Sequence, residues 1–123
     1  MHRTIENQAK YITDALQVTT TEPSYKSEYQ VHHIVAENHS SAQPARDIFA
    51  KSDVDITVND YRNLVPLKSF VHQHLHTQVY FAQVNTIIMN AYYLASSNRL
   101  GHVSGALSYI RTFLQNISNA SPF

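Results

Sequence analysis

QVHHIV, at residues 30–35, places two adjacent histidines inside a run that is otherwise typical of a short β-strand. Side chains alternate along a strand, so His32 and His33 are expected to point to opposite faces. A strand that is buried on both faces has little use for two polar imidazoles. Either the pair is functional or the strand is poorly buried, and the surrounding segments must distinguish these possibilities.

A second histidine stretch, NLVPLKSFVHQHLHTQVY, lies at residues 63–80. NLVPL is typical of a second short strand, and a helical pattern begins at about Phe70. On that helix His72 and His76 are four residues apart, so they share a face and can bind one ion together, whereas His74 falls on another face. A ββα unit of this kind would bring a strand histidine and two helix histidines together. Three ligands leave positions open for water and substrate, as in a catalytic metal site.

The other segments predict helices around this unit. Apolar residues at helical spacing predict an amphipathic helix at about 4–17, and a short helix with Pro44 in its first turn follows the first strand. The long helix that begins near Phe70 should end near SSNRLG, and a last helix should run from about 102 to 118. We therefore expect an α+β fold in a single domain of residues 1–123, with a ββα core at about 29–96.

Composition excludes several classes of site. Nine Lys plus Arg balance nine Asp plus Glu, so a negatively charged partner must be held by a local site, a metal or the eight histidines. The chain has no cysteine, which leaves histidine as the main ligand for a transition metal, and its two glycines provide no glycine-rich phosphate loop. The N-terminus has no apolar signal-peptide core, and IIMNAYYLA is too short to span a bilayer. We expect a soluble protein without a membrane partner.

The motifs, taken in order, resemble those of the AHH nucleases of the HNH and endonuclease VII superfamily, the His-Me finger nucleases. The order is HHIV, a PARDIF helix, a VDI step, an asparagine before an apolar strand that ends in leucine, then HxxxHT and a nearby tyrosine. It runs from about Gln30 to Val84. The sequence departs from the pattern at Val31, where the family name implies alanine, and at Leu64, where a glycine often follows the asparagine. Neither change removes a chemical group.

The resemblance implies a ββα-metal core and a role for each matching residue. His33 would be the general base that takes a proton from the water attacking the scissile phosphorus. His32 would be the metal ligand on the same strand, and His72 and His76 would complete the metal site from the helix. Asn63 would orient the base through its side-chain carbonyl.

Four further residues are candidates for contacts with the substrate. Tyr80 matches the aromatic position of the family signature. Arg46 and Lys68 are candidates for contacts with a nucleic-acid backbone. His39 could approach a phosphate from the loop after the strand.

The resemblance therefore implies a metal-dependent endonuclease that hydrolyses phosphodiester bonds of DNA, or alternatively of RNA. We expect little sequence specificity, because a small neutral domain without a helix that reads bases relies on contacts with the nucleic-acid backbone. One divalent ion is expected: three imidazoles suit Zn²⁺, Ni²⁺ or Mn²⁺, whereas phosphoryl chemistry often uses Mg²⁺. AHH domains resemble the toxic tips of bacterial polymorphic toxins. The resemblance thus implies a secreted effector that acts in the cytoplasm of a target cell, has no signal peptide of its own and is neutralised by a cognate immunity protein.

Two alternatives from other classes stay open. A catalytically silent, histidine-rich module could use the same metal fold to hold a partner, and would bind metal without hydrolysis. A helical interaction domain could carry HH and HQHLH as exposed histidines without a function, and would bind no stoichiometric metal. The sequence also leaves the oligomeric state open.

Overall fold

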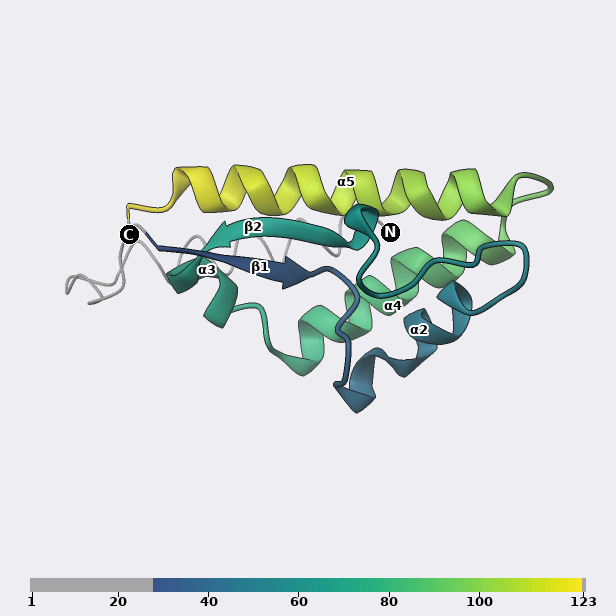
Figure 1. Cartoon of the computed structure of the whole chain (residues 1–123), viewed down its shortest axis with the longest axis horizontal. Helices are drawn as coiled ribbons and strands as arrows, with labels where there is room; N and C mark the ends of the chain where they lie inside the picture. The colour runs from purple at the N-terminus through teal and green to yellow at the C-terminus, as the bar shows by residue number, and fades with distance from the viewer. Residues whose placement is uncertain (1–27, 123) are drawn as a thin grey trace.

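The computed structural model describes residues 28–122, and the helix expected at residues 4–17 lies outside them. Within the described residues, helices surround one small sheet (Figure 1). In chain order the elements are β1 (Tyr29–His33), η1 (Ser40–Ala42), α2 (Gln43–Phe49), η2 (Tyr61–Asn63), β2 (Leu64–Lys68), α3 (Ser69–Gln73), α4 (Gln78–Tyr93) and α5 (Arg99–Ala120). This mixture of helices with an antiparallel sheet is the α+β class that the sequence predicts.

The two predicted strands are confirmed, and they pair antiparallel. His32 lies opposite Val65, and His33 lies opposite Leu64 at the end of β1. The first three residues of β1 are exposed, but His32 is only 1% exposed. β1 is thus a poorly covered strand that nevertheless buries one of its two histidines.

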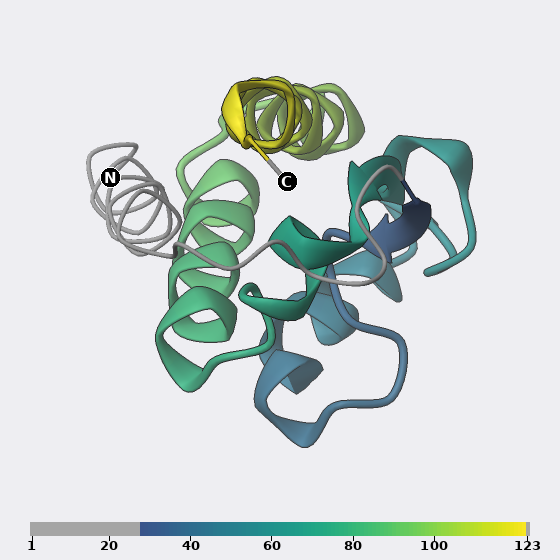
Figure 2. The ribbon, with the colours of Figure 1, turned by 90° about the vertical axis from the view of Figure 1, so that its left-hand side faces the viewer.

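The long helix α5 covers the sheet on the β2 side. In Figure 1, β2 lies directly beside α5, and β1 lies beyond β2. Figure 2, which looks along α5, shows α4 on one side of this helix and the strands on the other. The face of α5 that packs inward carries the apolar residues whose spacing predicts the helix: Val103, Leu107, Ile110, Leu114 and Ile117.

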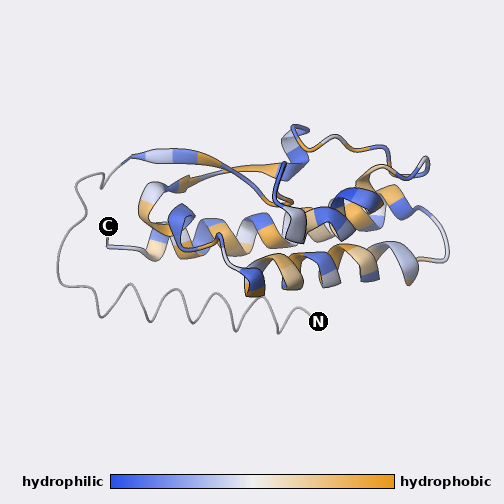
Figure 3. Ribbon diagram, turned by 90° about the horizontal axis from the view of Figure 1, so that it is seen from below, coloured by the Kyte–Doolittle hydropathy of each residue, from blue (hydrophilic) through white to orange (hydrophobic). Residues whose placement is uncertain are grey.

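Hydrophobic and hydrophilic residues alternate along the helices, as expected for helices with one buried face (Figure 3). The buried apolar residues form one cluster that joins the sheet to α2, α4 and α5. None of the described helices is both long and apolar enough to cross a membrane.

The expectation of one long helix from Phe70 is wrong, because the chain breaks between α3 and α4. Tight turns close the end of α3, where the N–H of His74 donates to the carbonyl of Val71 at 3.0 Å. Thr77 is extended, with φ −128° and ψ 154°, and its hydroxyl accepts the N–H of Tyr80 at 3.1 Å. The first helix, α3, therefore ends after about one turn, and Thr77 caps a second helix, α4.

The last helix begins at Arg99, three residues before the expected start at His102. Asn98 adopts the left-handed backbone conformation, with φ 51°, and its side chain accepts the N–H of Gly101 at 3.1 Å. Asn98 is therefore the cap, and Gly101 belongs to the first turn of α5. The short helix α2 is confirmed with Pro44 in its first turn.

Candidate functional site

Five histidines line one cavity of about 480 Å³. The cavity lies between β1, the loop that follows β1, and the turn that joins α3 to α4. The histidines are His32, His33, His39, His72 and His76. The fold thus joins the two histidine stretches that are separated along the chain.

His32, His72 and His76 each present one ring nitrogen to the same point, and these nitrogens all lie within 4.8 Å of one another. The Nε2 atoms of His72 and His76 are 3.0 Å apart. Two imidazole nitrogens bound to one ion at about 2.1 Å would be roughly 3.0 to 3.4 Å apart. The convergence therefore suits a shared metal ion, although His76 lies in the turn after α3 and not on the helix face that was expected.

Hydrogen bonds leave Nδ1 of His32 free to bind such an ion. The hydroxyl of Tyr80 donates to the carbonyl of Ile34 at 3.1 Å, so it accepts from Nε2–H of His32 at 2.8 Å. The lone pair of a neutral His32 is then on Nδ1. This nitrogen is buried and has no hydrogen-bond partner, a costly arrangement unless a ligand binds there.

His72 is oriented in the same manner. Its Nδ1 lies 2.8 Å from Oε1 of Gln30. The amide oxygen only accepts, so Nδ1 of His72 carries the proton and Nε2 keeps the lone pair. That Nε2 is the nitrogen that faces His76.

The surroundings favour the neutral, metal-binding form of these imidazoles. Burial lowers the pKa of His32 well below its ordinary value, and the neighbouring charges of His72, His76 and His33 lower it further. Burial also lowers the pKa of His72, with smaller contributions from His76 and His33. Both shifts keep the lone pairs available near neutral pH.

Asn63 is fully buried and binds the backbone, so the expected contact between its carbonyl and His33 is wrong. Its Oδ1 accepts the N–H of Val35 at 2.8 Å. Its Nδ2 donates to the carbonyl of Val35 at 3.0 Å and to that of Val58 at 2.8 Å. Asn63 therefore ties the end of β1 to the loop before η2, and it supports His33 only through the backbone.

Asn63→Ala is expected to lower the free energy of unfolding by about 3 kcal/mol, because it leaves buried backbone groups of Val35 and Val58 without partners. Urea unfolding of the metal-free protein measures the loss. The exposed Asn116→Ala is the matched control, with an expected change below about 0.5 kcal/mol. Equal stability of the two variants would contradict a clamping role for Asn63.

The side chain that contacts His33 is Asn59, whose role was not predicted from the sequence. Nε2 of His33 lies 2.8 Å from Oδ1 of Asn59. Asn59 lies two residues before η2, and the only sequence signal was a second asparagine close to Asn63.

Tyr80 is 1% exposed, so the expectation that it contacts the substrate is wrong. Burial raises the pKa of its hydroxyl, which keeps the proton that is donated to Ile34. Tyr80 instead fixes the tautomer and the orientation of His32 from behind, in the way that outer partners support metal-binding histidines.

Tyr80→Phe is expected to weaken the affinity for a divalent ion by about 10- to 100-fold, because Nε2–H of His32 loses its acceptor. Calorimetric titration of the metal-stripped protein measures the affinity. Tyr61→Phe, at a tyrosine that is 76% exposed, is the matched control and should bind as the wild type does. An unchanged affinity in Tyr80→Phe would show that the hydroxyl does not set the tautomer.

A family model described as "A nuclease family of the HNH/ENDO VII superfamily with conserved AHH" matches residues 13–119. The chain belongs to the AHH nuclease family. The match extends on both sides of the segment that carries the resemblance in the sequence, and it includes all of the histidines in the cavity. Neither a search of curated proteins nor a search of solved structures finds a match.

In this AHH nuclease, His39 lines the cavity from the loop after β1. Its ring stacks on Phe81 with 4.4 Å between centroids. Its Nδ1 accepts the N–H of Ser41 at 3.1 Å, so a neutral His39 carries its proton on Nε2. His39 can therefore donate a hydrogen bond from the second ring nitrogen.

Arg46 and Lys68 bind protein groups and do not line the cavity. Nη1 of Arg46 donates to the carbonyl of Ala36 at 2.6 Å, which supports the loop after β1. Nζ of Lys68 donates to the carbonyl of Ser121 at 2.8 Å and joins β2 to the end of α5. The structure thus gives both side chains a supporting contact in place of an open position at the site.

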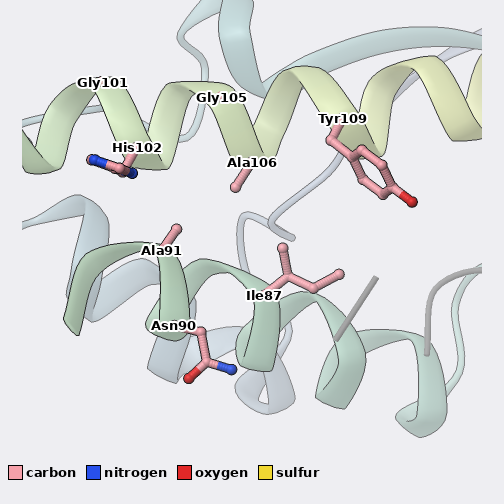
Figure 4. Close-up of a pocket in the computed structure, with 8 residues that line it drawn as sticks. All are labelled: Ile87, Asn90, Ala91, Gly101, His102, Gly105, Ala106 and Tyr109. Carbon is pink, nitrogen blue, oxygen red and sulfur yellow. The ribbon is translucent and has the colours of Figure 1, made fainter. Parts of the chain in front are cut away.

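A second cavity, of about 440 Å³, lies between α4 and α5. Figure 4 shows Ala106 and Tyr109 of α5 facing Ile87 and Ala91 of α4. His102 is the one histidine among the described residues that line it. A single imidazole has no second ligand there, so the histidine cavity beside β1 is the candidate site.

Proposed function

We propose that this AHH nuclease is a metal-dependent endonuclease that hydrolyses phosphodiester bonds of DNA with little sequence specificity. The proposal is carried by the convergence of His32, His72 and His76 beside His33, with Nδ1 of His32 buried and without a partner. Membership of a nuclease family supports a nucleic-acid substrate.

His32, His72 and His76 would hold one divalent ion. When bound, such an ion supplies positive charge that stabilises the phosphoryl oxygens and the departing 3′ oxygen. The all-histidine donor set fits Zn²⁺, Ni²⁺ or Mn²⁺, with Mg²⁺ as the alternative suggested by phosphoryl chemistry. The neutral forms favoured at His32 and His72 fit each of these ions.

His33 would act as the general base. It lines the same cavity but is not one of the three converging ligands, so its lone pair stays available to accept a proton from water. A positioned base of this kind typically contributes about 10²- to 10⁴-fold in rate. His39, with its proton on Nε2, would donate to a phosphate oxygen at the rim of the cavity.

The hydrogen bonds that the arginines make within the protein support low sequence specificity. Each arginine among residues 28–122 donates to a protein group. Arginine is the side chain that most often reads guanine edges, and none of these is free of internal contacts. Binding would therefore depend on phosphate contacts at the cavity.

The biological role that we propose is that of a bacterial effector with a cognate immunity protein. It is supported by the resemblance to AHH domains of polymorphic toxins alone. Protection of the substrate in mixtures of this chain with candidate immunity proteins would test it.

The test of the proposed activity is cleavage by metal-stripped protein to which Mg²⁺, Mn²⁺, Zn²⁺ or Ni²⁺ is returned. Supercoiled plasmid and a folded RNA are the two substrates, and EDTA is the blank. We expect nicking of the plasmid, slower cleavage of the RNA, and no cleavage in EDTA. Metal binding without cleavage of either polymer would favour the silent binding module.

A further inference from the structure

We infer that Asn59, held by Glu37, positions His33 so that Nδ1 of His33 is the nitrogen that accepts the proton. This inference rests on the proposed function, in which His33 is the base. It assigns a positioning role to two residues on the loops that flank the candidate site.

The three side chains form a hydrogen-bonded chain. Nε2 of His33 lies 2.8 Å from Oδ1 of Asn59. Nδ2 of the same asparagine donates to Oε2 of Glu37 at 3.3 Å. Glu37 and His33 both line the cavity, so the chain runs along its edge.

The chemistry of these groups fixes the direction of the chain. A carboxylate only accepts, so Glu37 binds the amino group of Asn59 and turns the amide oxygen toward His33. An amide oxygen also only accepts, so Nε2 of His33 must carry the proton. The lone pair of neutral His33 is then on Nδ1.

The position of Asn59 is fixed by the buried clamp described above. Asn63 donates to the carbonyl of Val58, the residue before Asn59, at 2.8 Å. It also binds Val35, two residues after His33. The buried asparagine thus holds the backbone on both sides of the contact, and the exposed asparagine orients the imidazole.

In the hydrolysis step, a water oxygen forms a bond to phosphorus as the bond from phosphorus to the 3′ oxygen breaks. The electron pair of the broken bond stays on the 3′ oxygen, and one proton of the water passes to Nδ1 of His33. The imidazolium that results donates from Nε2 to Asn59. The nearby carboxylate of Glu37 stabilises its positive charge.

The first test is the kinetics of Asn59→Ala on plasmid. We expect kcat to fall by about 10- to 100-fold, with KM and metal affinity nearly unchanged, because only the orientation of the base is lost. Asn116→Ala, an exposed asparagine on α5, is the matched control. The double variant Glu37→Gln/Asn59→Asp reverses the amide and carboxylate groups but still presents an acceptor to His33, and should recover much of the lost kcat.

The second test measures the tautomer of His33, which would not change if Asn59 had a merely structural role. The ¹⁵N shifts of His33 in the zinc-loaded protein, at a pH where the imidazole is neutral, report which nitrogen carries the proton. We expect the Nε2–H tautomer in the wild type and a mixture in Asn59→Ala. Full kcat in Asn59→Ala with the wild-type tautomer would overturn the inference while leaving the nuclease activity in place. A wild type that fails to cleave would overturn the proposed function, and the ¹⁵N shifts would still show whether Asn59 orients His33.

Discussion

His33→Ala is expected to lower kcat on plasmid by about 10²- to 10⁴-fold while metal affinity stays at the wild-type value. The substitution removes the group that accepts the proton from water. The converging nitrogens of His32, His72 and His76 remain. Because His33 is only partly buried at the end of β1, the variant should stay folded. Steady-state nicking at saturating metal measures kcat, and calorimetry measures the affinity.

The matched control for His33→Ala is His102→Ala, an exposed histidine on α5 that lines the other cavity. It should nick plasmid at the wild-type rate. Equal activity of His33→Ala and His102→Ala would show that His33 is not the base. A parallel loss of metal binding in His33→Ala would show that the variant disturbs the neighbouring ligand, His32.

His72→Ala is expected to abolish stoichiometric metal binding at concentrations that saturate the wild type, and cleavage with it. His72 supplies one of the three nitrogens, and its Nε2 lies 3.0 Å from that of His76. In the wild type, metal at 100 times its Kd should stabilise the fold by about 2.7 kcal/mol. This metal-dependent rise in Tm should disappear in the variant, and thermal melts with and without metal measure it.

His74→Ala is the matched control for His72→Ala, because His74 lies two residues further along the same segment. Its Nδ1 binds the carbonyl of Phe70 at 2.7 Å, and it does not line the cavity. We expect His74→Ala to retain the metal-dependent rise in Tm. A wild-type rise in Tm for His72→Ala would contradict the ligand set.

The two strands and the convergence of the histidines could be predicted from residue types and spacings within short segments of the sequence. Alternation in QVHHIV separates His32 from His33, and the structure has the first buried and the second partly exposed. The i,i+4 spacing brings His72 and His76 together even though the helix ends between them. The ring centroids of His72 and His76 are 4.8 Å apart, so the spacing predicts the contact although the predicted element is wrong.

The helix break itself depended on a single capping residue. Apolar periodicity continues through residues 70–94, which contain two threonines: the hydroxyl of Thr77 caps α4, whereas Thr86 lies inside α4. A threonine also occurs inside helices, so the sequence alone does not select the cap. The break places His76 in a turn, and from this turn its side chain faces His32.

The roles of Asn63 and Tyr80 could not be predicted because both act from buried positions. Asn63 precedes β2, as the resemblance requires, but its hydrogen bonds go to loops that only the fold brings near. Tyr80 lies one turn beyond His76 in the sequence, yet it contacts His32 from behind the cavity. Asn59 was missed for the same reason, since its contact with His33 joins residues that are far apart in the chain.

The most direct test of the central claim is one titration of the metal-stripped protein with a divalent ion, in which bound metal and plasmid nicking are followed together. We predict that nicking rises in step with occupancy and reaches its maximum at one ion per chain. The central claim is that His32, His72 and His76 hold a catalytic ion and that His33 is the general base next to it. Full occupancy without nicking, or nicking that proceeds equally well in EDTA, would contradict this claim.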